Sequence, residues 1–166
     1  HFIHSHDDSP FETGLAMINV GYAFTLMRPG NAIVYFNALE FGDGRDFPDD
    51  GRGDALGNYG DTITTLVGLR NTHGRGDYRN RLTEKETHIY ERSGSALVVL
   101  SNRNDDFLSE YRVDVDLPFG TALVEYTGNA ANDSGLAEIL LVDNDFFEVP
   151  SKVTVRSRGN NGLDNG

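Results

Sequence analysis

The densest group of reactive side chains stands near the start of the chain, where His4, Ser5, His6, Asp7 and Asp8 follow one another. Imidazole and carboxylate groups bind metal ions, transfer protons and stabilise charge in active sites, so this group is the first candidate for chemistry. Ser5, His6 and Asp7 do not form a serine triad, because neighbouring residues of a strand point to opposite sides. Two interpretations remain, a metal site and the end of an active-site strand.

A metal site would use His4 and His6, which point to the same side of an extended strand. Their His-x-His-x-Asp spacing is similar to part of the metallo-β-lactamase ligand motif. That motif continues with another histidine, whereas the residue after Asp8 is Ser9. Since only two histidines remain downstream, we predict no metal site here.

The elements around this group follow from the apolar pattern. Phe2 and Ile3 are typical of the inside of a strand, so the polar group stands where that strand ends. Ser9 and Pro10 suit the cap and the first position of a helix, and residues 11–27 repeat apolar side chains at helical spacing. Because a native terminus is usually polar, we expect that further chain precedes this strand.

A second strand and a second helix are expected next. Residues 32–36 form a short apolar run, which is typical of a strand covered on both faces. Residues 42–61 form a polar loop with six Asp and six Gly, and residues 62–70 have a helical pattern. Because Arg45 and Arg52 lie among the acids, we expect a solvated, internally ion-paired loop rather than a calcium site.

From about residue 77 the apolar period changes to two. Residues 111–117 and 153–155 alternate between apolar and polar side chains, as half-buried strands do. Turn residues separate further short strands, so the pattern predicts an antiparallel β-sandwich over residues 77–156, and we expect this part to be the independently stable unit. The further strands are expected at residues 88–91, 96–100, 122–126, 138–142 and 146–149.

The end of the chain and the aromatic residues of the β part complete the pattern. Residues 157–166 are polar and rich in Gly and Asn, which indicates a tail or linker. The aromatic side chains of the β part have two interpretations, core packing, which is the default, and a platform for carbohydrate. They are Tyr111, Tyr126, Phe146 and Phe147.

Composition narrows the classes of partner. The 166 residues carry 14 Lys and Arg against 26 Asp and Glu, a net charge of −12. This charge disfavours nucleic acids and anionic membranes as partners. No apolar run approaches the roughly 18 residues of a membrane span. Cysteine is absent, which excludes disulfides and thiolate metal sites and leaves the redox compartment open.

A longer pattern supports the second interpretation of the polar group. Phe2-Ile3-x-x-His6-Asp7 resembles the last conserved region of the α-amylase family of glycoside hydrolases, Phe-Val-x-Asn-His-Asp. The order of elements that follows is also similar to that family: a helix ending in residues 26–30, residues 33–36 like the last barrel strand, a Gly/Asp loop, a further helix and a β domain. The resemblance covers nearly the whole chain. Ser5 stands where Asn is usual, and Phe36-Asn37 replaces Tyr-Gly, which bears on the substrate class.

The resemblance implies a fold and an activity. Residues 1–76 would hold the last βα units of a (β/α)8 barrel, followed by the β-sandwich of residues 77–156 and the tail. The enzyme would hydrolyse or transfer at α-glucosidic bonds by a retaining mechanism. His6 would bind sugar hydroxyls and Asp7 would be the third carboxylate, which stabilises the transition state. The nucleophile and the general acid would lie on earlier strands, so this chain alone would be inactive.

The resemblance also bears on partners and location. It implies a carbohydrate substrate and no cofactor, and it leaves calcium open for the part of the parent enzyme outside this chain. The polymeric substrates of the family and the acidic, cysteine-free composition favour a secreted or periplasmic protein. A function of another class stays open, that of a non-catalytic carbohydrate-binding or stabilising β module. The sequence leaves the oligomeric state undetermined.

Overall fold

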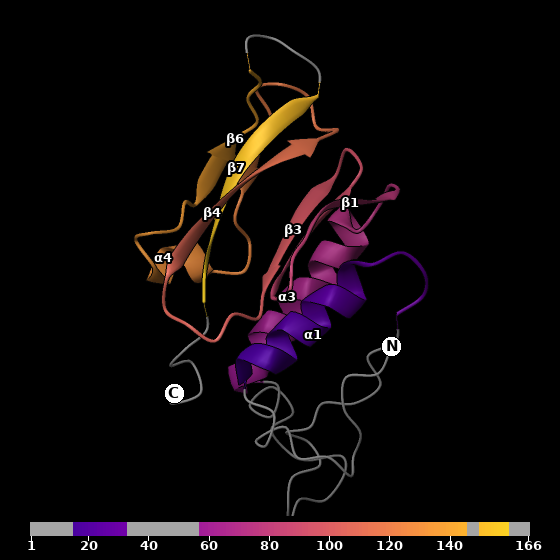
Figure 1. Cartoon of the computed structure of the whole chain (residues 1–166). Helices are drawn as coiled ribbons and strands as arrows, with labels where there is room; N and C mark the ends of the chain where they lie inside the picture. Colours follow the sequence, from indigo (N-terminus) through magenta and orange to yellow (C-terminus); the bar gives the residue numbers. More distant parts are fainter. Residues whose placement is uncertain (1–14, 33–56, 146–149, 160–166) are drawn as a thin grey trace, which may run out of the picture.

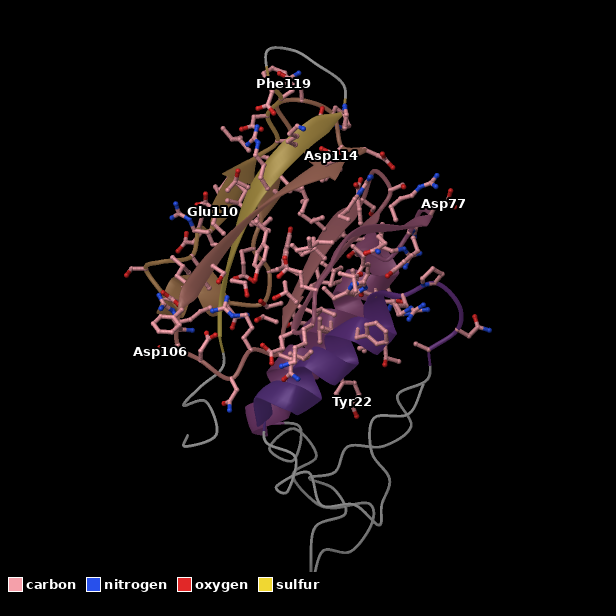
Figure 2. All side chains as sticks on the ribbon, in the orientation of Figure 1. Tyr22, Asp77, Asp106, Glu110, Asp114 and Phe119 are labelled. Carbon is pink, nitrogen blue, oxygen red and sulfur yellow. The ribbon has the colours of Figure 1, made fainter. Side chains whose placement is uncertain are left out.

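The computed structural model of the chain describes residues 15–32, 57–145 and 150–159 (Figure 1). Two helices lie on one side of a three-stranded sheet, and two further two-stranded sheets lie on its other side (Figure 1). Side chains fill the spaces between these layers (Figure 2). The elements are α1 (Leu15–Met27), α3 (Gly57–His73), β1 (Tyr78–Thr83), β2 (Thr87–Arg92), β3 (Ala96–Ser101), β4 (Leu108–Val115), β5 (Ala122–Val124), α4 (Asn129–Asn132), β6 (Ile139–Leu141) and β7 (Ser151–Arg158).

Helix α1 is apolar on most sides because it packs against two layers at once. Tyr22 and Leu26 lie against Leu66 of α3, while Met27 and its neighbours lie against the sheet residues Tyr90 and Val98. A helix with apolar side chains all round is typical of a buried position. The helix ends before Pro29, since the residue before a proline is disfavoured in the helical conformation.

All the strand pairs among the described residues are antiparallel. The strand order is β1-β2-β3 in the first sheet, and β4-β7 and β5-β6 form the other two. The predicted change to a strand-rich, antiparallel region is therefore confirmed. Three details differ from the prediction: strand β1 and the short helix α4 were not expected, and α3 begins at Gly57 rather than near residue 62. The tail predicted over residues 157–166 starts too early, because Ser157 and Arg158 belong to β7. The predicted strands over residues 33–36 and 146–149 and residues 160–166 of the tail lie outside the described residues.

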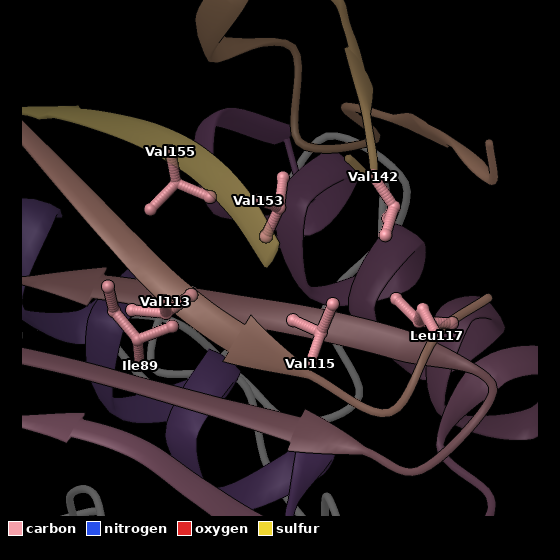
Figure 3. Close-up of a cluster of buried hydrophobic side chains, with 7 residues drawn as sticks. All are labelled: Ile89, Val113, Val115, Leu117, Val142, Val153 and Val155. Atoms are coloured by element: carbon pink, nitrogen blue, oxygen red, sulfur yellow. The ribbon is translucent and has the colours of Figure 1, made fainter. Parts of the chain in front are cut away.

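The apolar core of the β region lies between the facing sheets (Figure 3). Alternate residues of the central strands point into it, as the period-two pattern predicts. Ile89 and Val153 are completely buried, and the other members are 5% exposed or less. The seven residues are Ile89, Val113, Val115, Leu117, Val142, Val153 and Val155.

A buried carboxylate closes one end of this core. Glu91 of β2 is 0% exposed and accepts hydrogen bonds from Nε and Nη2 of Arg81, at 2.9 and 2.6 Å. The backbone N–H of Asp116 also donates to Glu91, at 2.9 Å. Arg81 reaches the carboxylate of Asp116 at 2.8 Å and holds the pKa of that carboxyl below its usual range. Because Asp116 follows β4, this network joins the first sheet to the second layer.

A second ionic contact fixes the end of β7. Arg158 donates to both carboxylate oxygens of Asp133, which also accepts a hydrogen bond from the backbone N–H of Gly135 at 2.8 Å. The hydrogen bonds from Arg158 and Gly135 lower the pKa of Asp133 to about 2. Arg158 donates in addition to the carbonyl of Asp106 at 2.9 Å. One guanidinium therefore ties the turn after α4 to the loop before β4.

Replacing Glu91 by Gln is expected to lower the free energy of unfolding by about 3 kcal/mol, because it leaves the guanidinium of Arg81 buried without its main partner. Urea unfolding followed by circular dichroism measures this. Glu110→Gln is the matched control, since Glu110 pairs with Arg156 at the surface and exposed pairs contribute about 1 kcal/mol or less. Equal losses in the two variants would contradict the prediction.

The Asp133 contact predicts an acid dependence of stability. The folded pKa of about 2 lies below the ordinary value of 3.8, so the stabilisation is fully present above pH 3.8 and is lost as the pH falls toward 2. Asp133→Asn should therefore flatten the melting temperature measured across this range. A variant whose melting temperature falls as steeply as that of the unaltered protein would refute the assignment.

Candidate functional site

The residues predicted to carry chemistry are divided between described and undescribed parts of the chain. His6 and Asp7 lie outside the described residues, as do Phe146, Phe147 and the loop up to residue 56. Tyr111 and Tyr126 are described. The structure therefore tests the elements that flank the predicted catalytic residues, not the catalytic residues themselves.

The two helices begin at the same end of their pair. Tyr22 lies against Leu66 and, one turn later, Leu26 is contacted by Arg70, so α1 and α3 run parallel. Figure 1 shows both running in the same direction. The segment that holds His6 and Asp7 leads into the start of α1, and the Asp-rich segment leads into the start of α3. Both predicted segments therefore join the described fold at one end.

Arg70 of α3 fixes the opposite end of α1. Its guanidinium donates to the carbonyl oxygens of Leu26, Arg28 and Gly30, the Arg28 contact being 3.0 Å long. These are the last carbonyls of the helix and the first of the segment that follows, which have no partner inside the helix. A cation is also favoured at a helix C-terminus by the helix dipole. The contact sets the direction in which the chain leaves α1.

Arg92 of β2 makes the corresponding contact from the sheet. Its Nη1 donates to the carbonyl of Met27 at 2.8 Å, and Nε and Nη2 donate to the carbonyl of Gly76 at 3.2 and 2.9 Å. Burial lowers the pKa of this guanidinium. Gly76 has φ +80° and a side chain there would lie 2.4 Å from the carbonyl of Ser93, so the close approach requires glycine. Arg92 therefore locks α1 to the turn that enters β1.

The two described aromatic residues of the predicted carbohydrate platform have different environments. Tyr111 packs against the core, and its hydroxyl lies 3.0 Å from that of Thr87, so it has a packing role. Tyr126 is 56% exposed, and its ring lies 5.8 Å from that of His73 at the end of α3. Of the described pair, Tyr126 alone presents a ring to solvent.

The histidines of the described region are engaged in structure. His88 Nε2 lies 2.8 Å from the hydroxyl of Tyr78, and Nδ1 lies 3.1 Å from both Thr83 Oγ1 and the carbonyl of Leu82. Among the described residues no group of three or more His, Asp or Glu side chains could hold a metal ion. The helices of this part of the chain are also too short or too polar to cross a membrane.

Comparison with solved structures places this geometry in a known fold. The chain is similar to a structure named "Cyclomaltodextrinase", with a TM-score of 0.61 over 94% of the chain. The two sequences are 17% identical, so the likeness is one of fold alone. The chain shares a distant α-amylase-family fold. It spans 27% of the length of that neighbour. No protein-family model and no curated protein matches the sequence.

Sequence reasoning missed the arginines that hold this arrangement together. Arg70 and Arg92 bond to backbone carbonyls, and every residue type has a carbonyl, so no partner residue signals the contact. Arg81 does have side-chain partners, but Glu91 lies on the neighbouring strand and Asp116 lies just after β4. Opposite charges at facing positions of neighbouring strands were the one sequence signal that could have revealed the contacts of Arg81.

The packing of α1 changes the expectation that residues from 77 onward are independently stable. A fragment that begins at Asp77 would expose Tyr90, Val98 and Leu100, which α1 now buries, and each large apolar side chain contributes about 1.5–3 kcal/mol when buried. We predict that this fragment loses the cooperative thermal unfolding of the whole chain. A fragment that begins at Leu15 is the control and should keep it. A melting curve for the Asp77 fragment that matches the whole chain would contradict the prediction.

Proposed function

We propose that this chain is the C-terminal part of an α-amylase-like glycoside hydrolase that acts on α-glucosidic bonds. The observation that carries the proposal is the likeness in fold to the cyclomaltodextrinase over 94% of the chain. The motif Phe2-Ile3-x-x-His6-Asp7, which stands directly before α1, supports it independently. The substrate would be a carbohydrate, and the reaction needs no cofactor within this chain.

The proposed arrangement assigns residues 1–76 to the last βα units of a (β/α)8 barrel. Parallel neighbouring helices are what consecutive βα units require, because the strands are parallel and each helix returns the chain in the opposite direction to its strand. In such barrels the active site lies where strands end and helices begin. Both predicted segments enter their helices at that end, which supports the assignment. Residues from 77 to the end of β7 at Arg158 would be the β-sandwich domain, and a tail or linker would follow it.

In the proposed mechanism Asp7 acts as a charged stabiliser. A retaining glycosidase breaks the glycosidic bond while a carboxylate forms a bond to the anomeric carbon, and a carboxylic acid gives its proton to the leaving oxygen. Water then cleaves the covalent intermediate. Positive charge develops at the anomeric carbon in both steps, and an ionised Asp7 beside it would stabilise that charge. His6 would donate a hydrogen bond to a hydroxyl of the same sugar.

The nucleophile and the general acid belong, in this proposal, to strands that precede residue 1. The chain alone therefore lacks two of the three carboxylates and would be inactive. It would contribute Asp7 and His6 to the cleft and would cover one side of the barrel with its β domain. The longer protein is the material in which the proposal is tested.

In that longer protein Asp7→Asn is expected to lower kcat by about 10²-fold, since removing one preorganised charged group costs on the order of 3 kcal/mol in the transition state. The substitution keeps the shape of the side chain and removes its charge. Steady-state hydrolysis of a maltooligosaccharide measures the effect. His6→Ala should lower kcat/KM by a smaller factor, because one hydrogen bond is lost.

Asp8→Asn is the matched control and should leave hydrolysis near its original rate. A large loss with Asp8→Asn and none with Asp7→Asn would show that the motif is assigned in the wrong register. A longer protein that binds maltooligosaccharides but never hydrolyses them would favour the alternative function, a non-catalytic β module. In that case the exposed ring of Tyr126 would be the first contact to examine.

A further inference from the structure

Two aromatic rings from distant parts of the chain meet at the surface of the protein. His73 is the last residue of α3, and Tyr126 follows β5. Their ring centroids lie 5.8 Å apart, with an angle of 38° between the ring planes. Tyr126 is 56% exposed and His73 is half-buried. Because tilted rings at this distance attract each other, each ring restrains the other. We call Tyr126 and His73 the ring pair.

The turn after β5 fixes the backbone that carries Tyr126. The carboxylate of Glu125 accepts hydrogen bonds from the backbone N–H and the hydroxyl of Thr127, and from the N–H of Ala130 at 3.2 Å. Burial alone would raise the pKa of Glu125, but these hydrogen bonds outweigh it and lower that pKa. The N–H of Glu125 donates to the carbonyl of Glu138 at 2.9 Å, which ties the turn to β6. An exposed ring on a fixed backbone loses little conformational freedom when a ligand binds.

The polar atoms of the ring pair are available to a ligand. Within the described part of the chain, neither the hydroxyl of Tyr126 nor the ring nitrogens of His73 have a hydrogen-bond partner. His88, in contrast, uses both of its nitrogens in contacts inside the fold. Thr127 and Asn129, which follow in the turn, are exposed and carry further hydroxyl and amide groups. The ring pair therefore combines an apolar ring surface with hydrogen-bonding groups at its edge.

This combination fits a neutral ligand that has both C–H and hydroxyl groups. The net charge of −12 disfavours an anion. A cation gains little from Glu125, since that carboxylate is already bonded by its own turn. A purely apolar partner would bury the nitrogens of His73 without a hydrogen bond, which is unfavourable. A sugar ring has an apolar face of C–H groups and hydroxyls around its edge, so it satisfies both rings.

We propose that the ring pair binds one sugar ring of an α-glucan chain. The apolar face of the sugar stacks on Tyr126, and one of its hydroxyls forms a hydrogen bond with His73. The choice of an α-glucan rests on the proposed function. His73 stands at the end of α3, whose 17 residues span about 25 Å at 1.5 Å per residue, and the proposed cleft lies where the helices begin. A glucan bound here therefore leaves His6 and Asp7 free for substrate.

An NMR titration of the 166-residue chain with maltoheptaose tests the proposal. One ring contact is small, so a Kd of about 1 mM is expected. Tyr126→Ala should raise this Kd about tenfold, and His73→Ala should raise it by a smaller factor. Tyr126→Phe keeps the ring and should keep most of the affinity. Phe107→Ala is the matched control, since Phe107 is 70% exposed just before β4, and it should bind as the unaltered chain does.

Three results would overturn the proposal. The first is the absence of maltoheptaose binding, and the second is equal binding by Tyr126→Ala, which would put the sugar elsewhere on the chain. The third is equal binding of sorbitol, which has hydroxyls but no ring, because the affinity would then not come from stacking. Circular dichroism checks that Tyr126→Ala is folded. If it is not, His73→Ala replaces it, and an unchanged Kd in that variant would likewise refute the site.

The result is separable from the test of the hydrolase function. Hydrolysis by the longer protein is expected to depend on Asp7, whereas binding by this chain is expected to depend on Tyr126. Hydrolysis together with no binding at the ring pair would refute the ring-pair site alone. Binding at the ring pair together with no hydrolysis would support the site and refute the hydrolase, which would leave the alternative function of a non-catalytic carbohydrate-binding module.

Discussion

Helix α1 lies between helix α3 and the sheet β1-β2-β3, and most of the described fold depends on its burial between them. One side of the helix packs against Leu66, and another packs against Tyr90. Because both contacts are apolar, neither layer can move away without exposing the other side of the helix to water. Arg70 and Arg92 then hold the last carbonyls of α1 from the two layers. The helices and the first sheet therefore behave as one body.

The sequence predicted the elements whose pattern is local. Alternation of apolar residues located β4 and β7, and the spacing around Tyr22 and Leu26 located α1. Strand β1 was missed because Tyr-Arg-Asn-Arg-Leu-Thr has little apolar alternation, and Arg81 is stabilised there by Glu91 and Asp116 from elsewhere in the chain. The first turn of α3 was missed because its glycines at positions 57 and 60 are poor helix formers. For β1 a contact outside the local window decided the structure.

In the candidate site, too, the sequence predicted features that residue types reveal locally and missed contacts between distant parts of the chain. The motif that ends in His6 and Asp7 was predicted from residue types and order, because imidazole and carboxylate groups are recognised by their chemistry, and it stays a prediction. The contacts that orient the helices after that motif were not found, because their acceptors are backbone oxygens. The fold adds the relative direction of the two helices. Because α1 and α3 are parallel, the polar segments that precede them in the sequence join the helix pair at the same end. The likeness to a longer solved structure agrees with that arrangement at the level of fold.

The outward side of the sheet β4-β7 has a role in choosing the register of the two strands. Shifting one strand by two residues would keep every valine on the core side, so the apolar pattern alone does not reject such a shift. In the native register Arg112 stands opposite Thr154, with Lys152 and Arg156 two residues away on either side. A shift by two in one direction would set Arg112 opposite Arg156, and in the other direction opposite Lys152. Like charges opposite each other are unfavourable, so the position of one arginine disfavours both misaligned sheets during folding.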